Sequence, residues 1–314
     1  MPPMRRSPVS PAIASSYAAG GSGPGIVPNT TVVDRTTGMA LRTKGFVGAR
    51  KQDADGPMLA ANSIAYGGAM GVDGKVTSDL RLGAFVGVGQ GQLSVDLSSQ
   101  TIDTNYLFGG IYGRFDWASR FLDFAVSTGH STNSSTRLVA NNLAPSGLET
   151  ATASYDGWFV SPELAYGVRI PVDGVVVTPT ARLRYVAGFF DGYSETGSAQ
   201  NLTVANRTVQ DIEERLEVAL SRTAPFLYGF LKTAATVGVL DPERLGDTTV
   251  NTVLIGQNLA FAAPGQNDAA GLYAGIGFDY RATERINLFT AAEGTMMSDK
   301  SRTGNARAGV RVAF

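Results

Sequence analysis

Residues 160–170, VSPELAYGVRI, and residues 175–189, VVVTPTARLRYVAGF, both place apolar side chains at every second position. Successive side chains of a β-strand point to opposite faces, so each stretch is predicted to form a strand with one apolar and one polar face. Glu163 and Arg169 lie on the polar face of the first strand, and Arg182 and Arg184 on that of the second. The residues VDG at 172–174 predict a tight turn between them.

The same alternation recurs along the chain from residue 43 onward. Such long strands suit a tilted crossing of an apolar slab about 25 Å thick. A soluble β-sandwich also alternates, but its strands average about 5–6 residues and its charged faces meet water. Twelve strands are predicted, an even number as in bacterial outer-membrane barrels: 43–51, 61–75, 79–94, 100–116, 120–132, 150–170, 175–192, 200–223, 226–240, 268–283, 285–297 and 302–314.

Short and long connections alternate between these predicted strands. The long ones fall at about 131–149 and 241–267. Short turns at one end and long loops at the other are typical of outer-membrane barrels, so the pattern predicts an all-β, 12-stranded antiparallel up-and-down transmembrane β-barrel. The short turns are predicted at 75–79, 116–119, 172–174, 223–225 and 282–284.

Composition excludes several other classes of protein. Charged residues make up 17% of the 314 residues, against roughly 25% in typical soluble chains. The formal net charge of −1 gives no basic footprint for nucleic acid. Because cysteine is absent, disulfides, zinc–thiolate sites and cysteine nucleophiles are excluded. We expect no cofactor and no metal.

The last predicted strand ends in ARAGVRVAF, residues 306–314. Alternation places Val310, Val312 and Phe314 toward lipid, and Arg307 and Arg311 toward a polar lumen. No sheet edge can remain unpaired in hydrocarbon, so this strand is predicted to pair with the first strand and close the barrel.

Residues 1–40 are rich in proline, glycine and serine, and we interpret them as a linker that leads toward or into the lumen, with the barrel over residues 41–314. The first residues include two arginines but no continuous apolar core of a signal peptide. We therefore expect either a C-terminal piece of a longer protein or a misassigned start.

Six stretches together carry a resemblance to a known family: GFVGARKQDADG, DLRLGAFVGVG, YDGWFVSPELAYGVRIP, VTPTARLRY, QDIEERLEVALS and AGIGFDYRATERINLFTAAEGTMMSDKSRTGNARAGVRVAF. They resemble the translocator β-domain of autotransporters, the type V secretion proteins. The similarity runs over residues 45–314, and the resemblance implies a barrel in the outer membrane of a Gram-negative bacterium. It further implies a covalently linked N-terminal passenger, a linker inside the lumen, and recognition of Val310, Val312 and Phe314 by the barrel-assembly machinery.

The chain departs from that family before the first strand. The family has an amphipathic helix there, whereas residues 29–45 are short and rich in β-branched side chains. About two helical turns around residues 35–42 are conceivable, but helix propensity argues against them.

Charged residues of both signs occupy the predicted lumenal face. They either pair across strands and brace the wall, or Glu163, Arg182 and Arg184 hold the linker in the pore. Glu214 falls on the lipid face, either near the headgroups or beside a bulge that shifts the register. The predicted lumenal residues are Glu163, Arg169, Arg182, Arg184, Asp211, Glu213, Arg215, Glu217, Lys232, Asp279, Arg307 and Arg311.

No catalytic residues are assigned, and we expect a protein that is not an enzyme. The single histidine, His130, invites comparison with outer-membrane phospholipases. Thr132 stands where their serine nucleophile would be, and Ser131 falls on the opposite face of a strand, so His130 is interpreted as a surface-loop residue.

We conclude from the sequence that the chain is a monomeric barrel in outer-membrane lipid that translocates and anchors a passenger at the cell surface. The alternative is a self-standing outer-membrane porin, or an adhesin that acts through its surface loops. A soluble β-sandwich is the third class.

Overall fold

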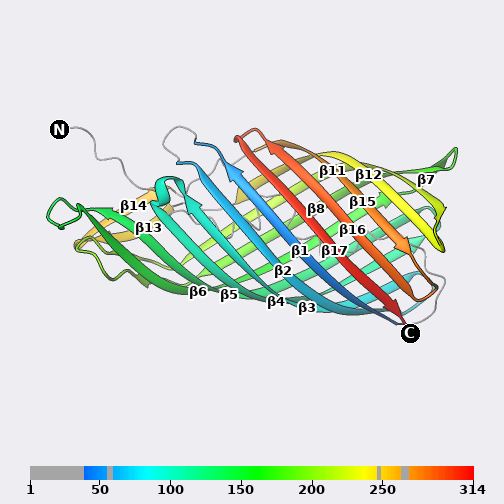
Figure 1. Cartoon of the computed structure of the whole chain (residues 1–314), viewed down its shortest axis with the longest axis horizontal. Coiled ribbons are helices and arrows are strands. Elements are labelled where there is room, and N and C mark those ends of the chain that lie inside the picture. The colour runs from blue at the N-terminus through cyan, green and yellow to red at the C-terminus, as the bar shows by residue number, and fades with distance from the viewer. Residues whose placement is uncertain (1–38, 55–58, 246–248, 263–268) are drawn as a thin grey trace.

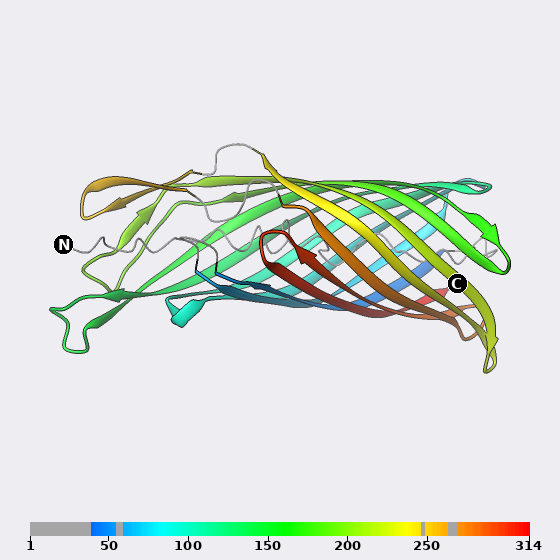
Figure 2. The same cartoon turned by 90° about the horizontal axis from the view of Figure 1, so that it is seen from above.

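A computed structural model describes residues 39–54, 59–245, 249–262 and 269–314, and these close into one antiparallel barrel (Figures 1 and 2). Among them, twelve strands cross the barrel wall, each hydrogen-bonded to its neighbours in sequence. The predicted up-and-down barrel is therefore confirmed. The wall comprises β1 (Ala40–Gln52), β2 (Ala61–Lys75), β3 (Leu80–Val95), β4 (Gln100–Trp117), β5 (Arg120–Ala140), β6 (Leu148–Val168) with its short continuation β7 (Ile170–Val172), β8 (Val175–Phe190), β11 (Arg207–Phe226), β12 (Gly229–Leu245), β15 (Gly271–Arg281), β16 (Ile286–Met297) and β17 (Ser301–Ala313).

The barrel closes where the first strand meets the last. β1 pairs with β17 without interruption from Ala40↔Ala313 to Gln52↔Ser301. This seam, defined as the β1–β17 pairing, leaves no free edge in the wall, and Figure 1 shows the two strands side by side. The last strand is thus tied down along its whole length, as the alternation in residues 306–314 predicts.

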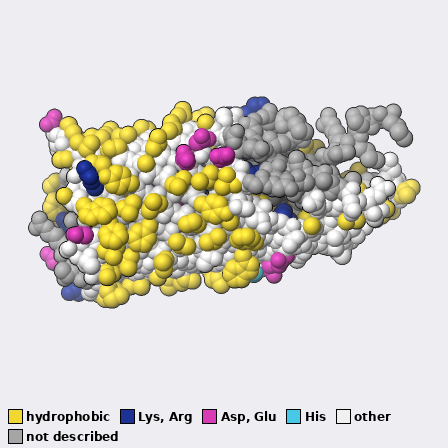
Figure 3. Space-filling view, turned by 180° about the vertical axis from the view of Figure 1, so that it is seen from behind, with side chains coloured by type: hydrophobic (Ala, Val, Ile, Leu, Met, Phe, Trp, Pro, Cys, Tyr) yellow, Lys and Arg dark blue, Asp and Glu magenta, His cyan; other side chains and the backbone are white. Residues whose placement is uncertain are grey.

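The outer surface of the wall is apolar over a broad band (Figure 3). Leu164 and Leu183 are cross-strand partners that point outward, with 48% and 43% of their surface exposed, whereas the next residue, Arg184, points inward and is buried. Glu214 also points outward, opposite Asp241, and the β11–β12 register around it is unbroken, so no bulge shifts it. In the part of the chain that is described, no helix is long and apolar enough to span a bilayer.

The two ends of the barrel differ. One end, here the short-turn end, carries the tight turns together with the start of β1 and the end of β17. The other, the long-loop end, carries the longer connections, and β5 and β6 rise there well beyond β15, β16 and β17 (Figure 2). The rim at the long-loop end is therefore high on one side and low on the other.

The predicted loop at 131–149 is wrong. β5 continues to Ala140 and β6 begins at Leu148, so the connection is only residues 141–147. Beyond the apolar band both faces of these strands are polar, and STNSSTR at 131–137 gives no hydropathy alternation. The backbone ladder continues regardless, because it depends on hydrogen bonds that carry no sequence signal.

Two further boundaries are corrected. The turn predicted at 223–225 lies at Leu227 and Tyr228, since Pro225 still pairs with Phe230. Proline is tolerated there because the ladder ends at the next residue, Phe226. The loop predicted at 241–267 contains the end of β12 and a hairpin of β13 (Thr249–Leu254) and β14 (Gln257–Ala262).

A small second sheet stands at the long-loop end. It has the order β14-β13-β10-β9, with β9 at Tyr193–Ser194 and β10 at Leu202–Val204. Tyr193, Leu202 and Val204 pack on Tyr155 and Phe190 of the tall wall. An ion pair between Arg137 and the buried Glu195 also fixes the connection between β8 and β11 to β5. This connection is therefore an ordered extension of the wall.

The linker predicted at residues 1–40 lies outside the described residues as far as residue 38. The short helix considered for residues 35–42 is wrong for its last three residues, which belong to β1. Pairing of Ala40 with Ala313 and with Asp73 commits them to the sheet.

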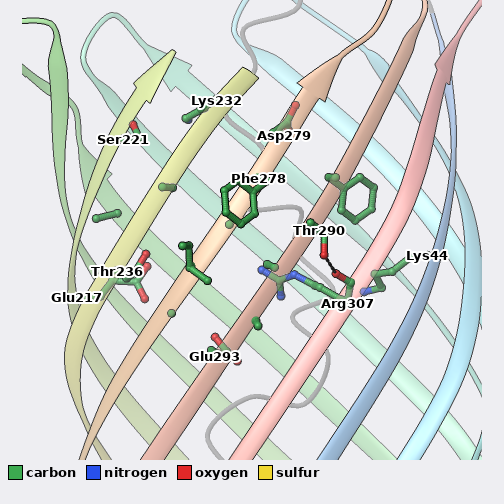
Figure 4. Close-up of a pocket in the computed structure, with 18 of the residues that line it drawn as sticks. Lys44, Glu217, Ser221, Lys232, Thr236, Phe278, Asp279, Thr290, Glu293 and Arg307 are labelled. Atoms are coloured by element: carbon green, nitrogen blue, oxygen red, sulfur yellow. Dashed lines mark hydrogen bonds between the residues drawn. The ribbon is translucent and has the colours of Figure 1, made fainter. Parts of the chain in front are cut away.

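Replacing Leu183 by arginine should lower the free energy of unfolding in lipid vesicles by roughly 2–4 kcal/mol, because a guanidinium would face hydrocarbon. Thr236→Arg is the matched control, since Thr236 lines the interior (Figure 4). Denaturant titration of both variants measures the difference. An equal loss in the free energy of unfolding for Leu183→Arg and Thr236→Arg would contradict the assigned register.

Candidate functional site

The interior of the barrel holds a cavity of about 180 Å³ bounded by the wall. Lys44 and Arg307 project toward it from β1 and β17, and Glu217 faces it from β11 (Figure 4). The lining includes small residues such as Ala234 and Gly275, so the wall side chains leave the centre open. This lumenal wall is the candidate functional site.

One half of the lumenal wall is a network of charges on β6, β8, β11, β15 and β16. Glu163 accepts a hydrogen bond from Arg182, whose second nitrogen lies 3.8 Å from Glu217. Arg184 donates to Glu213 at 3.1 Å. Each charge therefore has an opposite charge on a neighbouring strand, which offsets the cost of burying it.

Arg215 links strands that are not neighbours in this charge network. Its guanidinium stacks 4.2 Å from the ring centre of Tyr273 on β15 and reaches Glu293 on β16, with 3.9 Å between nitrogen and oxygen. Tyr273 in turn donates a hydrogen bond to Glu217. The network thus connects β11 with β15 and β16 across the inner wall.

Five of the seven lumenal residues emphasised by the sequence lie in this one network: Glu163, Arg182, Arg184, Glu213 and Arg215. The other two lie elsewhere on the inner wall. Asp211 pairs with Arg244 at 3.5 Å, nearer the long-loop end. Arg169 pairs with Asp116 at the short-turn end and stacks 4.9 Å from the ring centre of Phe121.

The lumenal wall also carries a group of aromatic rings on β1, β3 and β4. The Phe108 ring is tilted against those of Phe46 and Phe85, with ring centres 6.0 and 6.3 Å apart. Their rings lie against the wall over glycines: a Cβ on Gly87 would sit 2.4 Å from the Phe108 ring, and one on Gly67 2.6 Å from Phe46. Glycine is required at these positions so that the rings lie flat and leave the lumen open.

A second charge cluster crosses the seam, and sequence reasoning missed its central residue. Asp73 on β2 is fully buried and accepts hydrogen bonds from Arg42 on β1, Arg81 on β3 and, at 3.1 Å, the hydroxyl of Tyr112 on β4. Arg311 on β17 lies 3.7 Å away. One carboxylate therefore ties together five strands, including the first and the last.

The signal for Asp73 was present in the sequence. Asp73 stands among GVDGK, which resembles a turn, but it follows Met70 and Val72 in strict alternation and so falls on the inner face. Its partners come from strands that are far apart in sequence, so the convergence itself carries no local signature.

His130 lies in β5, so its interpretation as a surface-loop residue is wrong. It points outward, 3.8 Å from Asp156, with its ring edge-on to Trp158 at 4.8 Å. Ser131 is buried on the opposite face, as alternation predicts.

Comparison with known families matches residues 41–293 to the autotransporter beta-domain. The chain belongs to the autotransporter beta-domain family. The translocator domain of the autotransporter NalP from Neisseria meningitidis has a TM-score of 0.71 at 20% identity, covering 89% of both chains. The beta domain of the Bordetella autotransporter BrkA has a TM-score of 0.64 at 14% identity, covering 88% of this chain and all of the other.

Two rickettsial proteins are related in sequence to this autotransporter barrel. Outer membrane protein A of Rickettsia rickettsii is 27% identical over 185 residues, and outer membrane protein B of Rickettsia typhi is 23% identical over 316. The chain covers only 8% and 18% of their respective lengths. The barrel resides in the outer membrane of a Gram-negative bacterium.

Removing the Asp73 carboxylate should destabilise the autotransporter barrel strongly. Asp73→Asn leaves Arg42, Arg81 and Arg311 without their counter-charge, and breaking such a buried group costs about 3–5 kcal/mol. Asp116→Asn is the control, because Asp116 is 44% exposed, its pair with Arg169 lies away from the seam and the expected loss is below about 1 kcal/mol. Unfolding in denaturant measures both, and equal losses would contradict the special position of Asp73.

Proposed function

We propose that this barrel carries an N-terminal passenger across the outer membrane and anchors it at the cell surface. The observation that carries the proposal is the direction of β1 in a barrel of the autotransporter family. β1 begins with Ala40 at the short-turn end, beside Ala313 of β17. If that end faces the periplasm, residues that precede β1 reach the surface only by passing through the lumen.

The dimensions and chemistry of the lumen support passage of an extended chain. Twelve strands lie between the eight that fill a barrel with side chains and the sixteen or more that leave a wide channel. The wall offers both aromatic and charged side chains, so apolar and polar side chains of a passing segment both meet compatible surfaces. A folded domain would not fit.

In this proposal the charged side chains of the wall stabilise the barrel and do not bind the passenger. Glu163, Arg182 and Arg184 have partners on neighbouring strands, which favours bracing of the wall over capture of the linker. A passing chain then meets side chains whose charges are already balanced, so it slides without strong binding. In this proposal the protein acts by transport and not by catalysis.

The proposal includes the route of assembly. Val310, Val312 and Phe314 form the end of the strand that closes the seam, with Val312 and Phe314 exposed on the outer face. We assign these three side chains as the signal read by the barrel-assembly machinery, and the assembled barrel as a monomer. The closing strand suits this role because its placement completes the wall.

Passenger transport is tested by fusing a signal peptide and an epitope ahead of residue 1 and expressing the fusion in a Gram-negative host. Protease added to intact cells should remove the epitope, because it has reached the surface. The control fusion lacks residues 301–314 and should keep its epitope protected. A barrel that is heat-modifiable in the outer membrane while its epitope stays protected would instead favour a porin or a loop adhesin.

Deleting Phe314 should reduce assembly in cells several-fold while leaving spontaneous folding into vesicles nearly unchanged. Only the cellular route involves the assembly machinery. The heat-modifiable fraction on gels measures both routes, and Phe226→Ala at another exposed aromatic serves as the control. Normal assembly in cells, or equal losses by both routes, would contradict the assigned signal.

A further inference from the structure

The outer face of the barrel is hollowed over the seam, forming an apolar groove of about 900 Å³. Its floor is made of small outward-facing residues on the central strands, namely Gly45 on β1, Gly68 on β2 and Ala308 on β17. Barrel walls are convex on the outside, so a hollow of this size requires larger side chains on both sides of a low floor.

The walls of this seam groove are large apolar side chains. On one side stand Met70, Val86 and Val88 of β2 and β3, each more than half exposed. On the other side stand Phe278, Tyr280 and Leu288 of β15 and β16. The floor spans β17, β1 and β2, and the walls flank it on either side.

The glycines of the floor are not required by the packing of the barrel. A Cβ on Gly45 would meet nothing closer than 3.9 Å, and one on Gly68 nothing closer than 3.6 Å, both ordinary contacts. This differs from the inward Gly67 and Gly87, where rings of the wall occupy the place of the side chain. Glycine weakens a strand, so its use where a side chain would fit points to an occupant outside the wall.

The apolar lining of the groove favours a hydrocarbon ligand. Its outward-facing side chains are apolar apart from the Tyr280 phenol and the hydroxyls of Thr43 and Thr290, and Thr290 donates its hydroxyl to the Arg307 carbonyl at 3.1 Å. Because the surrounding strands cross the outer membrane, the medium in contact with the groove is lipid. An extended acyl chain has the length and width to lie along such a trough.

The position of the groove in the membrane favours glycerophospholipid over lipopolysaccharide. Gly45 lies five residues from the start of β1, so the groove is nearer the short-turn end than the long-loop end. That end faces the periplasmic leaflet, which holds glycerophospholipid. No outward arginine or lysine lines the groove, as binding of the several phosphates of lipopolysaccharide would require.

We infer that the seam groove is a lipid-binding site that holds an acyl chain of a glycerophospholipid from the periplasmic leaflet. The acyl chain covers the pairing of β1 with β17 and fills the space left by Gly45 and Gly68. The bound lipid thereby seals the closure of the barrel on its outer side, while the Asp73 cluster closes it on the inner side.

The experiment is native mass spectrometry of the barrel purified from membranes, with lipid identified after extraction. The wild-type barrel should retain about one phospholipid through detergent exchange. The double variant Gly45→Leu/Gly68→Leu fills the floor and should lose it at least tenfold. Ala181→Leu adds the same side chain to the outer face of β8, on the far wall, and should leave retention unchanged.

A second measurement needs no variant. A phospholipid with a photoreactive group in its acyl chain should crosslink to peptides of β1, β2 and β17 in the wild-type barrel. Absence of retained lipid, equal retention by the double variant, crosslinks spread evenly over the wall, or retention of lipopolysaccharide in place of phospholipid would each overturn the assignment. Heat-modifiability of each variant verifies that the barrel has folded.

Discussion

The pairing of β1 with β17 is the contact on which the rest of the structure depends. In hydrocarbon, an unpaired backbone amide or carbonyl costs several kcal/mol, so a sheet can cross the membrane only when its two edges join. These two strands are separated by most of the sequence, and their pairing joins the two edges of the sheet.

Both faces of the seam carry features that fit this central position. On the inner face, Asp73 gathers Arg42 and Arg311 from the two closing strands, and the cluster can form only in the register that is observed. On the outer face, Gly45 and Ala308 leave the seam low between larger side chains. A charge cluster inside and an apolar trough outside therefore meet at the same pair of strands.

The lumen achieves openness by two means. Its aromatic rings lie flat over glycines, and its charged side chains reach sideways to one another, as Arg215 does to Glu293. A wall whose charged side chains pair with one another is suited to passing many different sequences, because a chain in transit meets charges that already have partners.

The amino-acid sequence by itself determined the number of spanning strands, their inward and outward faces and the closure of the wall, because a period of two in hydropathy reports directly on a boundary between lipid and lumen. It failed at residues 131–149, where both faces are polar and the period vanishes although the ladder continues. It also identified Glu163, Arg182 and Arg184 as inner-wall charges without indicating their partners. Those partners, the convergence on Asp73 and the groove above Gly45 were decided only by the tertiary structure, since each depends on the register and curvature that bring distant strands together.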